Sequence, residues 1–213
     1  MNNKNTILLI IGLLLIGCTA TVNKSIYIED GQTKEGDINT VNGAIIIGEN
    51  CKVFGNSRAV NGHIEVGKGS LVEGLTTVNG SISIARQCSV TNDIRSINGR
   101  IDTEMETKID GRVSTINGDI EFKGTHILRD VETINGDLYL KAGSVVEGNI
   151  IVEDKGHFSD DEKHRIDIYI MQESLVKGDV RVENKNAVVE LHLSENSKVL
   201  GDIINAEIIY ENN

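Results

Sequence analysis

Proline and tryptophan are absent from this sequence, and aromatic residues are scarce, with three Phe and four Tyr in 213 residues. Conventional sandwich and α/β cores rely on large rings for buried area, so both classes are disfavoured. Basic side chains are also in the minority, because 21 Lys and Arg face 32 Asp and Glu, for a net charge of −11. That balance argues against a nucleic-acid partner, whose phosphates must be neutralised by Lys or Arg.

Residues 1–17 have the features of an export signal. Lys4 gives a positive charge near the amino terminus, and an apolar run follows at residues 7–16. The run is too short to span a bilayer, which needs about 20 apolar residues. It ends in Leu15-Ile16-Gly17-Cys18, a sequence that resembles the lipobox of bacterial lipoproteins.

The lipobox resemblance implies cleavage before Cys18 and attachment of acyl chains such as palmitate to that residue. Several acyl chains bind a membrane far more tightly than one. Thr19, rather than Asp, follows the cysteine, a pattern similar to outer-membrane sorting in Gram-negative lipoproteins. We expect a signal peptide at 1–17, the lipidated Cys18 with a short tether at 18–21, and one folded domain at 22–213. A secretory signal with an incidental cysteine is the alternative.

A tripeptide, Val-Asn-Gly or Ile-Asn-Gly, recurs at steps of 18 or 19 residues, which is typical of a solenoid. It begins at Val41, Val60, Val78, Ile97, Ile116 and Ile134. One aliphatic column follows at Ile45, Ile64, Ile82, Ile101, Ile120 and Leu138, and a second two residues later at Ile47, Val66, Ile84, Thr103, Phe122 and Leu140. A third holds Val53, Val72, Val90, Ile109, Leu128 and Val146, and a fourth holds Leu75, Ile94, Val113 and Val131, with Ser57 as a polar exception.

Short alternating segments punctuated by Gly, Asn and Asp indicate β-strands. Three such segments per coil predict an all-β, single-domain parallel β-helix of about nine coils of 18–19 residues, with a partial turn ending at Tyr210. The stacked Val, Ile and Leu columns would fill a thin lumen, which accounts for the missing aromatics.

An asparagine recurs in every copy of the tripeptide: Asn42, Asn61, Asn79, Asn98, Asn117 and Asn135. We interpret the column as a structural ladder in which each amide bonds its neighbour, rather than as a binding stripe, because unpaired buried amides are costly. The glycine that follows is expected to supply the positive φ of the bend.

The period alone does not fix the handedness of the helix, because left-handed hexapeptide helices also use 18 residues per coil. The 19-residue coils break the hexapeptide spacing and favour a right-handed helix. Turns such as Gly36-Asp37-Ile38, Gly178-Asp179-Val180 and Gly201-Asp202-Ile203 resemble those of bactofilins, the polymer-forming scaffold proteins of bacteria. The resemblance implies a right-handed β-helix and self-association, although typical bactofilins are cytoplasmic and lack a lipid anchor.

Catalytic motifs are missing: no P-loop, nucleophile elbow, CxxC or HExxH occurs. Glu65, Asp102 and Glu121 share one column with Tyr27, Ile46, Ser83 and Tyr139, and we expect no His or Arg to support these acids, so we interpret the column as a solvated acidic face. Cys51 and Cys88 lie two coils apart, about 9.6 Å by strand spacing, which predicts free thiols. We therefore expect no enzyme activity, no cofactor and no metal.

Two insertions interrupt the repeat near 153–163 and 183–186, at one corner of consecutive coils. Loops that leave a rigid scaffold are where function usually concentrates. The sequence proposes His157, Phe158, Asp160, Asp161 and His164 as partner-binding residues, with metal binding by the two histidines and two aspartates as a weaker hypothesis and a disordered polar loop as the alternative.

Together these features predict a lipid-anchored, non-enzymatic β-helical scaffold or interaction protein of the bacterial cell envelope, at the outer membrane if the cell is Gram-negative. The expected partners are the membrane, through the lipid, and an envelope protein or polysaccharide, with self-association also open. The alternative is a β-helix that binds or processes envelope polysaccharide.

Overall fold

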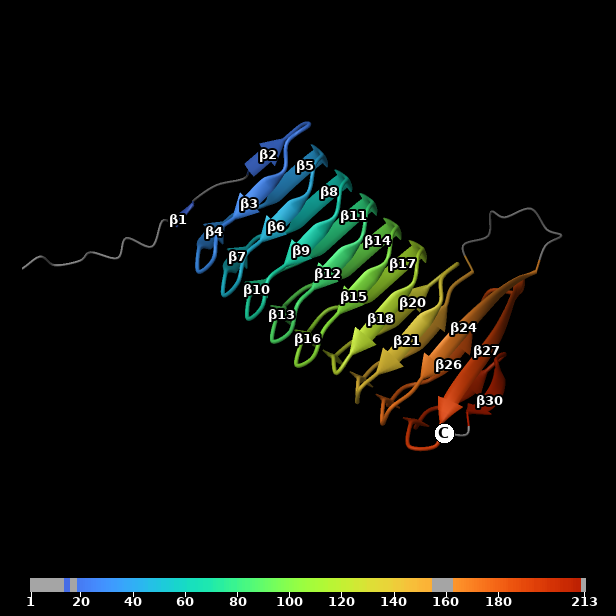
Figure 1. Ribbon diagram of the computed structural model, residues 1–213. Coiled ribbons are helices and arrows are strands. Elements are labelled where there is room, and N and C mark those ends of the chain that lie inside the picture. The colour runs from blue at the N-terminus through green and yellow to red at the C-terminus, as the bar shows by residue number, and fades with distance from the viewer. Residues whose placement is uncertain (1–13, 16–18, 155–162, 212–213) are drawn as a thin grey trace, which may run out of the picture.

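The computed structural model describes residues 14–15, 19–154 and 163–211. All regular structure in these residues is β-strand, and they contain no helix long and apolar enough to cross a membrane. The strands form three parallel sheets of ten strands each, and every third strand along the chain joins the same sheet (Figure 1). The predicted parallel β-helix is thereby confirmed, with about ten turns.

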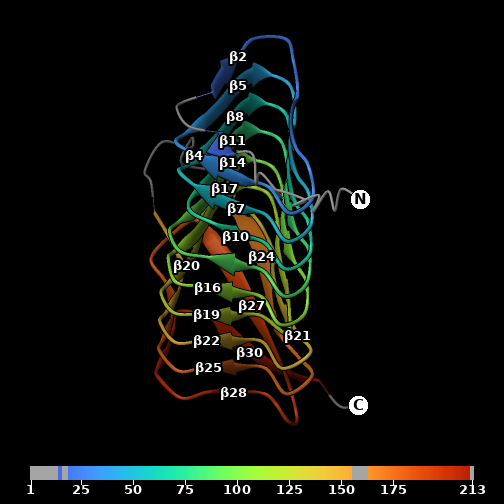
Figure 2. The ribbon, with the colours of Figure 1, turned by 90° about the vertical axis from the view of Figure 1, so that its left-hand side faces the viewer.

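The first sheet, whose strands are stacked in Figure 2, contains β1 (Leu14–Leu15), β4 (Thr33–Glu35), β7 (Lys52–Phe54), β10 (Leu71–Val72), β13 (Ser89–Val90), β16 (Lys108–Ile109), β19 (His126–Ile127), β22 (Val145–Val146), β25 (Leu175–Val176) and β28 (Lys198–Val199). The second contains β2 (Thr19–Thr21), β5 (Ile38–Asn42), β8 (Ser57–Asn61), β11 (Leu75–Asn79), β14 (Ile94–Asn98), β17 (Val113–Asn117), β20 (Val131–Thr133), β23 (Ile150–Val152), β26 (Val180–Val182) and β29 (Ile203–Ile204). The third contains β3 (Ile26–Ile28), β6 (Ile45–Ile47), β9 (Ile64–Val66), β12 (Ile82–Ile84), β15 (Ile101–Thr103), β18 (Ile120–Lys123), β21 (Leu138–Lys141), β24 (His164–Ile170), β27 (Ala187–Ser194) and β30 (Glu207–Glu211).

The solenoid begins earlier than the sequence indicated. From β3 to β30 the chain makes the nine coils and partial turn that the repeat predicts. Upstream, β1 pairs with β4, and β2 pairs with β5 through Thr19 and Thr21. Residues 19–21, expected to be a tether, are therefore a strand of the second sheet.

The lumen is filled by the predicted aliphatic columns. The column that starts at Ile45 is fully buried through Leu138, and Phe122 is the largest of the completely buried side chains. Fully burying one such side chain contributes about 1.5–3 kcal/mol. Stacked medium-sized side chains therefore provide the core that large rings provide elsewhere.

One lumen position differs from the prediction. Ile127, not Leu128, pairs with Ile109 and Val146 and is 0% exposed. This coil has 18 residues rather than 19. The missing residue falls before β19, in the turn where Gly124 adopts a φ of 53°. The prediction that Leu128 belongs to the third lumen column is therefore wrong for this coil.

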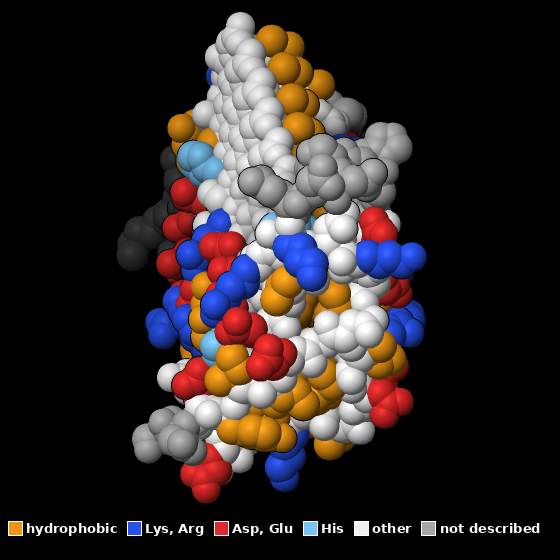
Figure 3. Space-filling view, turned by 90° about the vertical axis from the view of Figure 1, so that its right-hand side faces the viewer, with side chains coloured by type: hydrophobic (Ala, Val, Ile, Leu, Met, Phe, Trp, Pro, Cys, Tyr) orange, Lys and Arg blue, Asp and Glu red, His pale blue; other side chains and the backbone are white. Residues whose placement is uncertain are grey.

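The Asn-Gly corner contains a continuous chain of amide hydrogen bonds. Each Nδ2 donates to the Oδ1 of the asparagine one coil earlier, from Asn42 to Asn23 through to Asn135 to Asn117, at 2.6–2.9 Å. Figure 3 faces this corner and shows an uncharged strip with a row of hydrophobic side chains beside it. Val41 and Val60, which directly precede ladder asparagines in the sequence, are 40% and 39% exposed.

The glycines of this corner do not supply a positive φ, so that expectation was wrong. Gly43, Gly62 and Gly80 are not among the glycines with positive φ. A Cβ on Gly62 or Gly80 would instead lie closer than 3.0 Å to the carbonyl oxygen of the glycine one coil earlier. Only glycine fits because the backbones of successive coils approach each other so closely.

Both insertions lengthen strands as well as turns. β24 and β27 pair over seven residues, whereas β21 has four. Ile166 and Val189, in the added parts, are 1% and 2% exposed. The longer strands thus extend the core beyond the corner, on the right in Figure 1.

The two described cysteines are free thiols, as the register predicted. Both are buried, and burial raises the pKa of each thiol above its ordinary value. Ser70 separates them in the same column, where its Oγ accepts a hydrogen bond from the Cys51 backbone N–H at 2.9 Å.

Candidate functional site

The outer face of the third sheet carries ion pairs, stacked aromatic rings and a buried histidine. One outward column runs its whole length, because the parallel register places one residue of each coil above the last. Its members are Tyr27, Ile46, Glu65, Ser83, Asp102, Glu121, Tyr139, Tyr169, His192 and Ile209.

The carboxylates in the middle of this column are paired with basic side chains from neighbouring columns. Arg100 donates to Asp102 at 2.5 Å and also pairs with Glu121. Lys141 lies 3.2 Å from Glu121, and His63 lies 3.2 Å from Glu65. The expectation that neither His nor Arg supports these acids was therefore wrong: the supporting residues lie two positions earlier on the same face.

The electrostatics of Glu121 do not suit a general acid. Burial raises its pKa, but the hydrogen bond and charge of Lys141, with Arg100 and Lys123, outweigh burial and place the pKa below its ordinary value. A general acid needs a raised pKa to hold its proton near neutral pH. Glu121 is instead an ionised member of an ion-pair ladder.

Aromatic rings replace the carboxylates further along the column. Tyr139 and Tyr169 are stacked with centroids 5.0 Å apart, and Tyr169 and His192 with centroids 4.3 Å apart. Burial, followed by the charge of Asp137, raises the pKa of Tyr139 to about 12. The pKa of Tyr169 is raised by burial and then by Asp167. Both phenols are therefore neutral at physiological pH.

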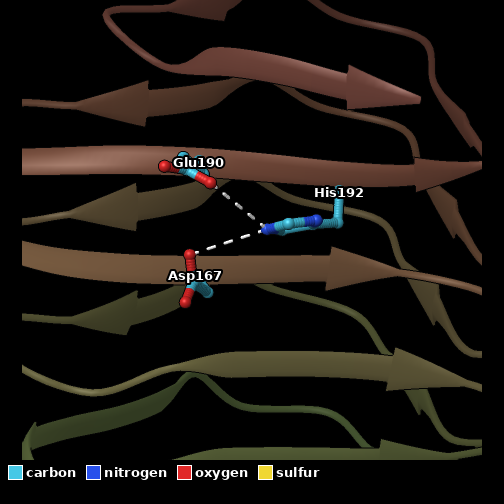
Figure 4. Close-up of side chains that lie close together, drawn as sticks. All are labelled: Asp167, Glu190 and His192. Carbon is cyan, nitrogen blue, oxygen red and sulfur yellow. Dashed lines mark ion pairs between the residues drawn. The ribbon is translucent and has the colours of Figure 1, made fainter. Parts of the chain in front are cut away.

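His192 ends this stack and lies at the centre of a polar cluster (Figure 4). Its Nδ1 lies 2.7 Å from Glu211 Oε1. Its Nε2 lies 3.6 Å from Asp167 Oδ1 and 3.8 Å from Glu190 Oε2, and it has no hydrogen-bond partner. The residue is only 7% exposed. Asp167, Glu190 and His192 could together hold a metal ion, because their ligand atoms all lie within 4.8 Å of one another.

Most residues proposed from the insertions lie outside the described part of the chain: His157, Phe158, Asp160 and Asp161, as does the lipidation candidate Cys18. His164 is described. It begins β24, and its Nε2 lies 3.4 Å from the carbonyl oxygen of Ile134, which half-buries it against the corner.

The cluster around His192 was missed in the sequence. The aliphatic pairs Ile168–Ile170 and Leu191–Leu193 continue the lumen columns in the sequence. The residues between them, Tyr169 and His192, therefore continue the outward column, a signal that the sequence contains. Searches of protein-family models, curated proteins and solved structures give no match to this chain.

Proposed function

We propose that this protein is a lipid-anchored, non-enzymatic β-helical scaffold of the bacterial cell envelope, and that it pairs with a second copy through its C-terminal coil. The supporting observation is a contrast between the two ends of the lumen. Ile26 and Ile28 of the first coil are 8% and 3% exposed. Ile208 and Tyr210 continue the same two columns in the last coil and are 38% and 70% exposed.

The shape of the exposed end favours a second copy as its occupant. β28, β29 and β30 are the last strands of their sheets, so each offers an edge with free hydrogen-bonding groups. Leu200 and Ile204 add apolar surface, 62% and 41% exposed, at the end shown lowest in Figure 3. A partner that meets three edges and the lumen together needs the same three-sided cross-section, which another copy has. Two copies related by a two-fold axis would pair self-complementary surfaces.

The lipid anchor restricts this assembly to pairs. Cys18, if lipidated, holds the opposite end of the rod at the membrane. Ten coils make each rod about 48 Å long, so a pair would span about 96 Å with an anchor at each end. Such a pair lies along the membrane surface and presents its long faces to envelope proteins. A Gram-negative cell would carry it on the outer membrane. The bactofilin-like open polymer is not proposed.

Processing of envelope polysaccharide gains no support from the third-sheet face. Asp102 and Glu121 are held in ion pairs, and the stacked Tyr139 and Tyr169 rings cover each other's faces. Those faces are the surfaces that a sugar ring would contact. We therefore propose no second function.

Membrane fractionation and photo-crosslinking in cells test this proposal. The natural chain should partition with membranes, and Cys18→Ser should release it. A photo-crosslinking amino acid at position 210 should give a covalent dimer. The same probe at Tyr27, which is 66% exposed on the first coil, is the matched control and should give none. Membrane-bound Cys18→Ser protein, or crosslinks from position 210 only to other molecules, would contradict the proposal.

A further inference from the structure

We infer that Asp167, Glu190 and His192 form a binding site for one divalent transition-metal ion of the zinc class. The site lies on the outer face of β24 and β27, near the C-terminal end of the rod. It does not rest on the proposed lipidation or pairing, because all three ligands belong to one chain and lie outside the last coil, which contributes only Glu211, the partner of His192 Nδ1.

The hydrogen bond at Nδ1 determines what Nε2 can do. A carboxylate such as Glu211 accepts hydrogen bonds, so Nδ1 carries the proton at this 2.7 Å contact. The Nε2 of the neutral imidazole then directs a lone pair at the oxygens of Asp167 and Glu190. The Nε2 nitrogen itself lies 3.6 and 3.8 Å from those oxygens, too far for a hydrogen bond to either. A cation between the three atoms satisfies all of them.

The negative charge around His192 also favours a cation here. Asp167 and Glu190 are direct cross-strand partners, and like charges at such positions destabilise a sheet. Arg165 pairs with the same two oxygens, 2.9 Å from Asp167 Oδ1 and 2.8 Å from Glu190 Oε2, so a bound ion would share both carboxylates with the guanidinium. Asp137 adds a further negative charge, since its Oδ1 accepts the Asp167 backbone N–H at 2.9 Å.

The geometry and the donor types favour zinc over calcium or magnesium. Four-coordinate zinc binds His nitrogen and carboxylate oxygen at about 2.1 Å, which places tetrahedral ligands about 3.4 Å apart. The two nitrogen–oxygen separations, 3.6 and 3.8 Å, are within a few tenths of an ångström of that value, and all three ligand atoms lie within 4.8 Å of one another. Calcium and magnesium prefer oxygen ligands throughout. Glu211 acts as the outer carboxylate that orients a metal-binding histidine, and the Tyr169 ring fixes its plane.

Calorimetric titration of the metal-stripped full chain with Zn²⁺ tests the site. We expect one ion per chain, no comparable binding of Mg²⁺ or Ca²⁺, and a raised melting temperature with zinc. His192→Gln should weaken binding at least about 100-fold, and Glu211→Gln about 10-fold. His126→Gln is the matched control, because His126 lies 2.7 Å from one carboxylate, Glu147, on the first sheet. It should change nothing.

Two further readouts keep the result decisive. His157→Gln and His164→Gln should leave the affinity unchanged, so loss of binding in either would move the metal to the insertion and overturn the inference. In the natural chain, Co²⁺ should give the visible absorption of a four-coordinate site, which needs no variant to fold. Absence of stoichiometric Zn²⁺ binding, or binding that survives His192→Gln, would also overturn it.

Discussion

The regular region, residues 26–152, and the C-terminal region, residues 164–211, share one construction but differ in what their surfaces carry. Asp and Asn side chains accept the backbone N–H of the next coil in both, from Asp37 with Asn56 to Asp179 with Asp202, each at 2.9 Å. The asparagine ladder, however, ends at Asn135. Beyond it the strands lengthen, and rings and a buried histidine occupy the outward column. The last residues of two lumen columns are exposed.

This difference separates the parts of the repeat that build the rod from those that can change. The lumen columns and the backbone-capping Asp or Asn continue through both regions, because every coil needs a core and satisfied turns. The Asn-Gly corner does not continue, and the outward column continues but changes from carboxylates to rings. The stacked rings and the buried histidine lie where the asparagine ladder has ended and the outward column has changed.

The largest expected effect contrasts the two ends of the lumen. Ile101→Ala, at a fully buried position, should destabilise the rod by about 2–5 kcal/mol, because it leaves a cavity that neighbours cannot fill. Ile208→Ala in the last coil should cost less than about 1 kcal/mol in the monomer, since the residue is 38% exposed. Chemical denaturation of both variants measures the difference. Equal losses would mean that the C-terminal coil is closed.

The asparagine ladder should contribute less than the lumen. Asn98→Ala removes one donated bond to Asn79 and one accepted bond from Asn117, at 2.9 and 2.8 Å. Because water can replace part of them, the expected loss is about 1 kcal/mol. Asn92→Ala, an exposed asparagine outside the ladder, is the control and should stay within about 0.5 kcal/mol. A ladder variant as stable as this control would show that the column has another purpose.

The smallest expected effects are pH dependences of opposite sign. The pKa of Glu121 is lowered, so its contribution to stability is present above its ordinary value of 4.5 and is lost as the pH falls through the folded-state pKa. The pKa of Tyr139 is raised from 10.0 to about 12, so stability should fall as the pH rises above 10. Glu121→Gln should weaken the acid dependence alone and Tyr139→Phe the alkaline dependence alone, to which Tyr169 also contributes. Unfolding measured across pH checks both.

The sequence predicted the rod far better than the site. The lumen columns and the Asn42–Asn135 ladder follow from a fixed period, and a period is visible in one chain. The role of Gly62 was misjudged because backbone contact between coils leaves no trace in local turn preferences. His192 escaped notice because its partners, Asp167 and Glu211, come from different coils across an irregular insertion. Their proximity arises only when the register is known.

Sedimentation velocity tests the proposal that two copies pair through their C-terminal coils. The chain carrying Cys18→Ser should sediment as a dimer about 96 Å long. Adding Tyr210→Lys, which places a charge on a 70% exposed lumen residue, should convert it to a monomer with unchanged β-content. Tyr27→Lys, at a residue 66% exposed on the first coil, should leave the dimer intact. A monomer at every concentration without Tyr210→Lys, or a dimer that survives it, would contradict the claim.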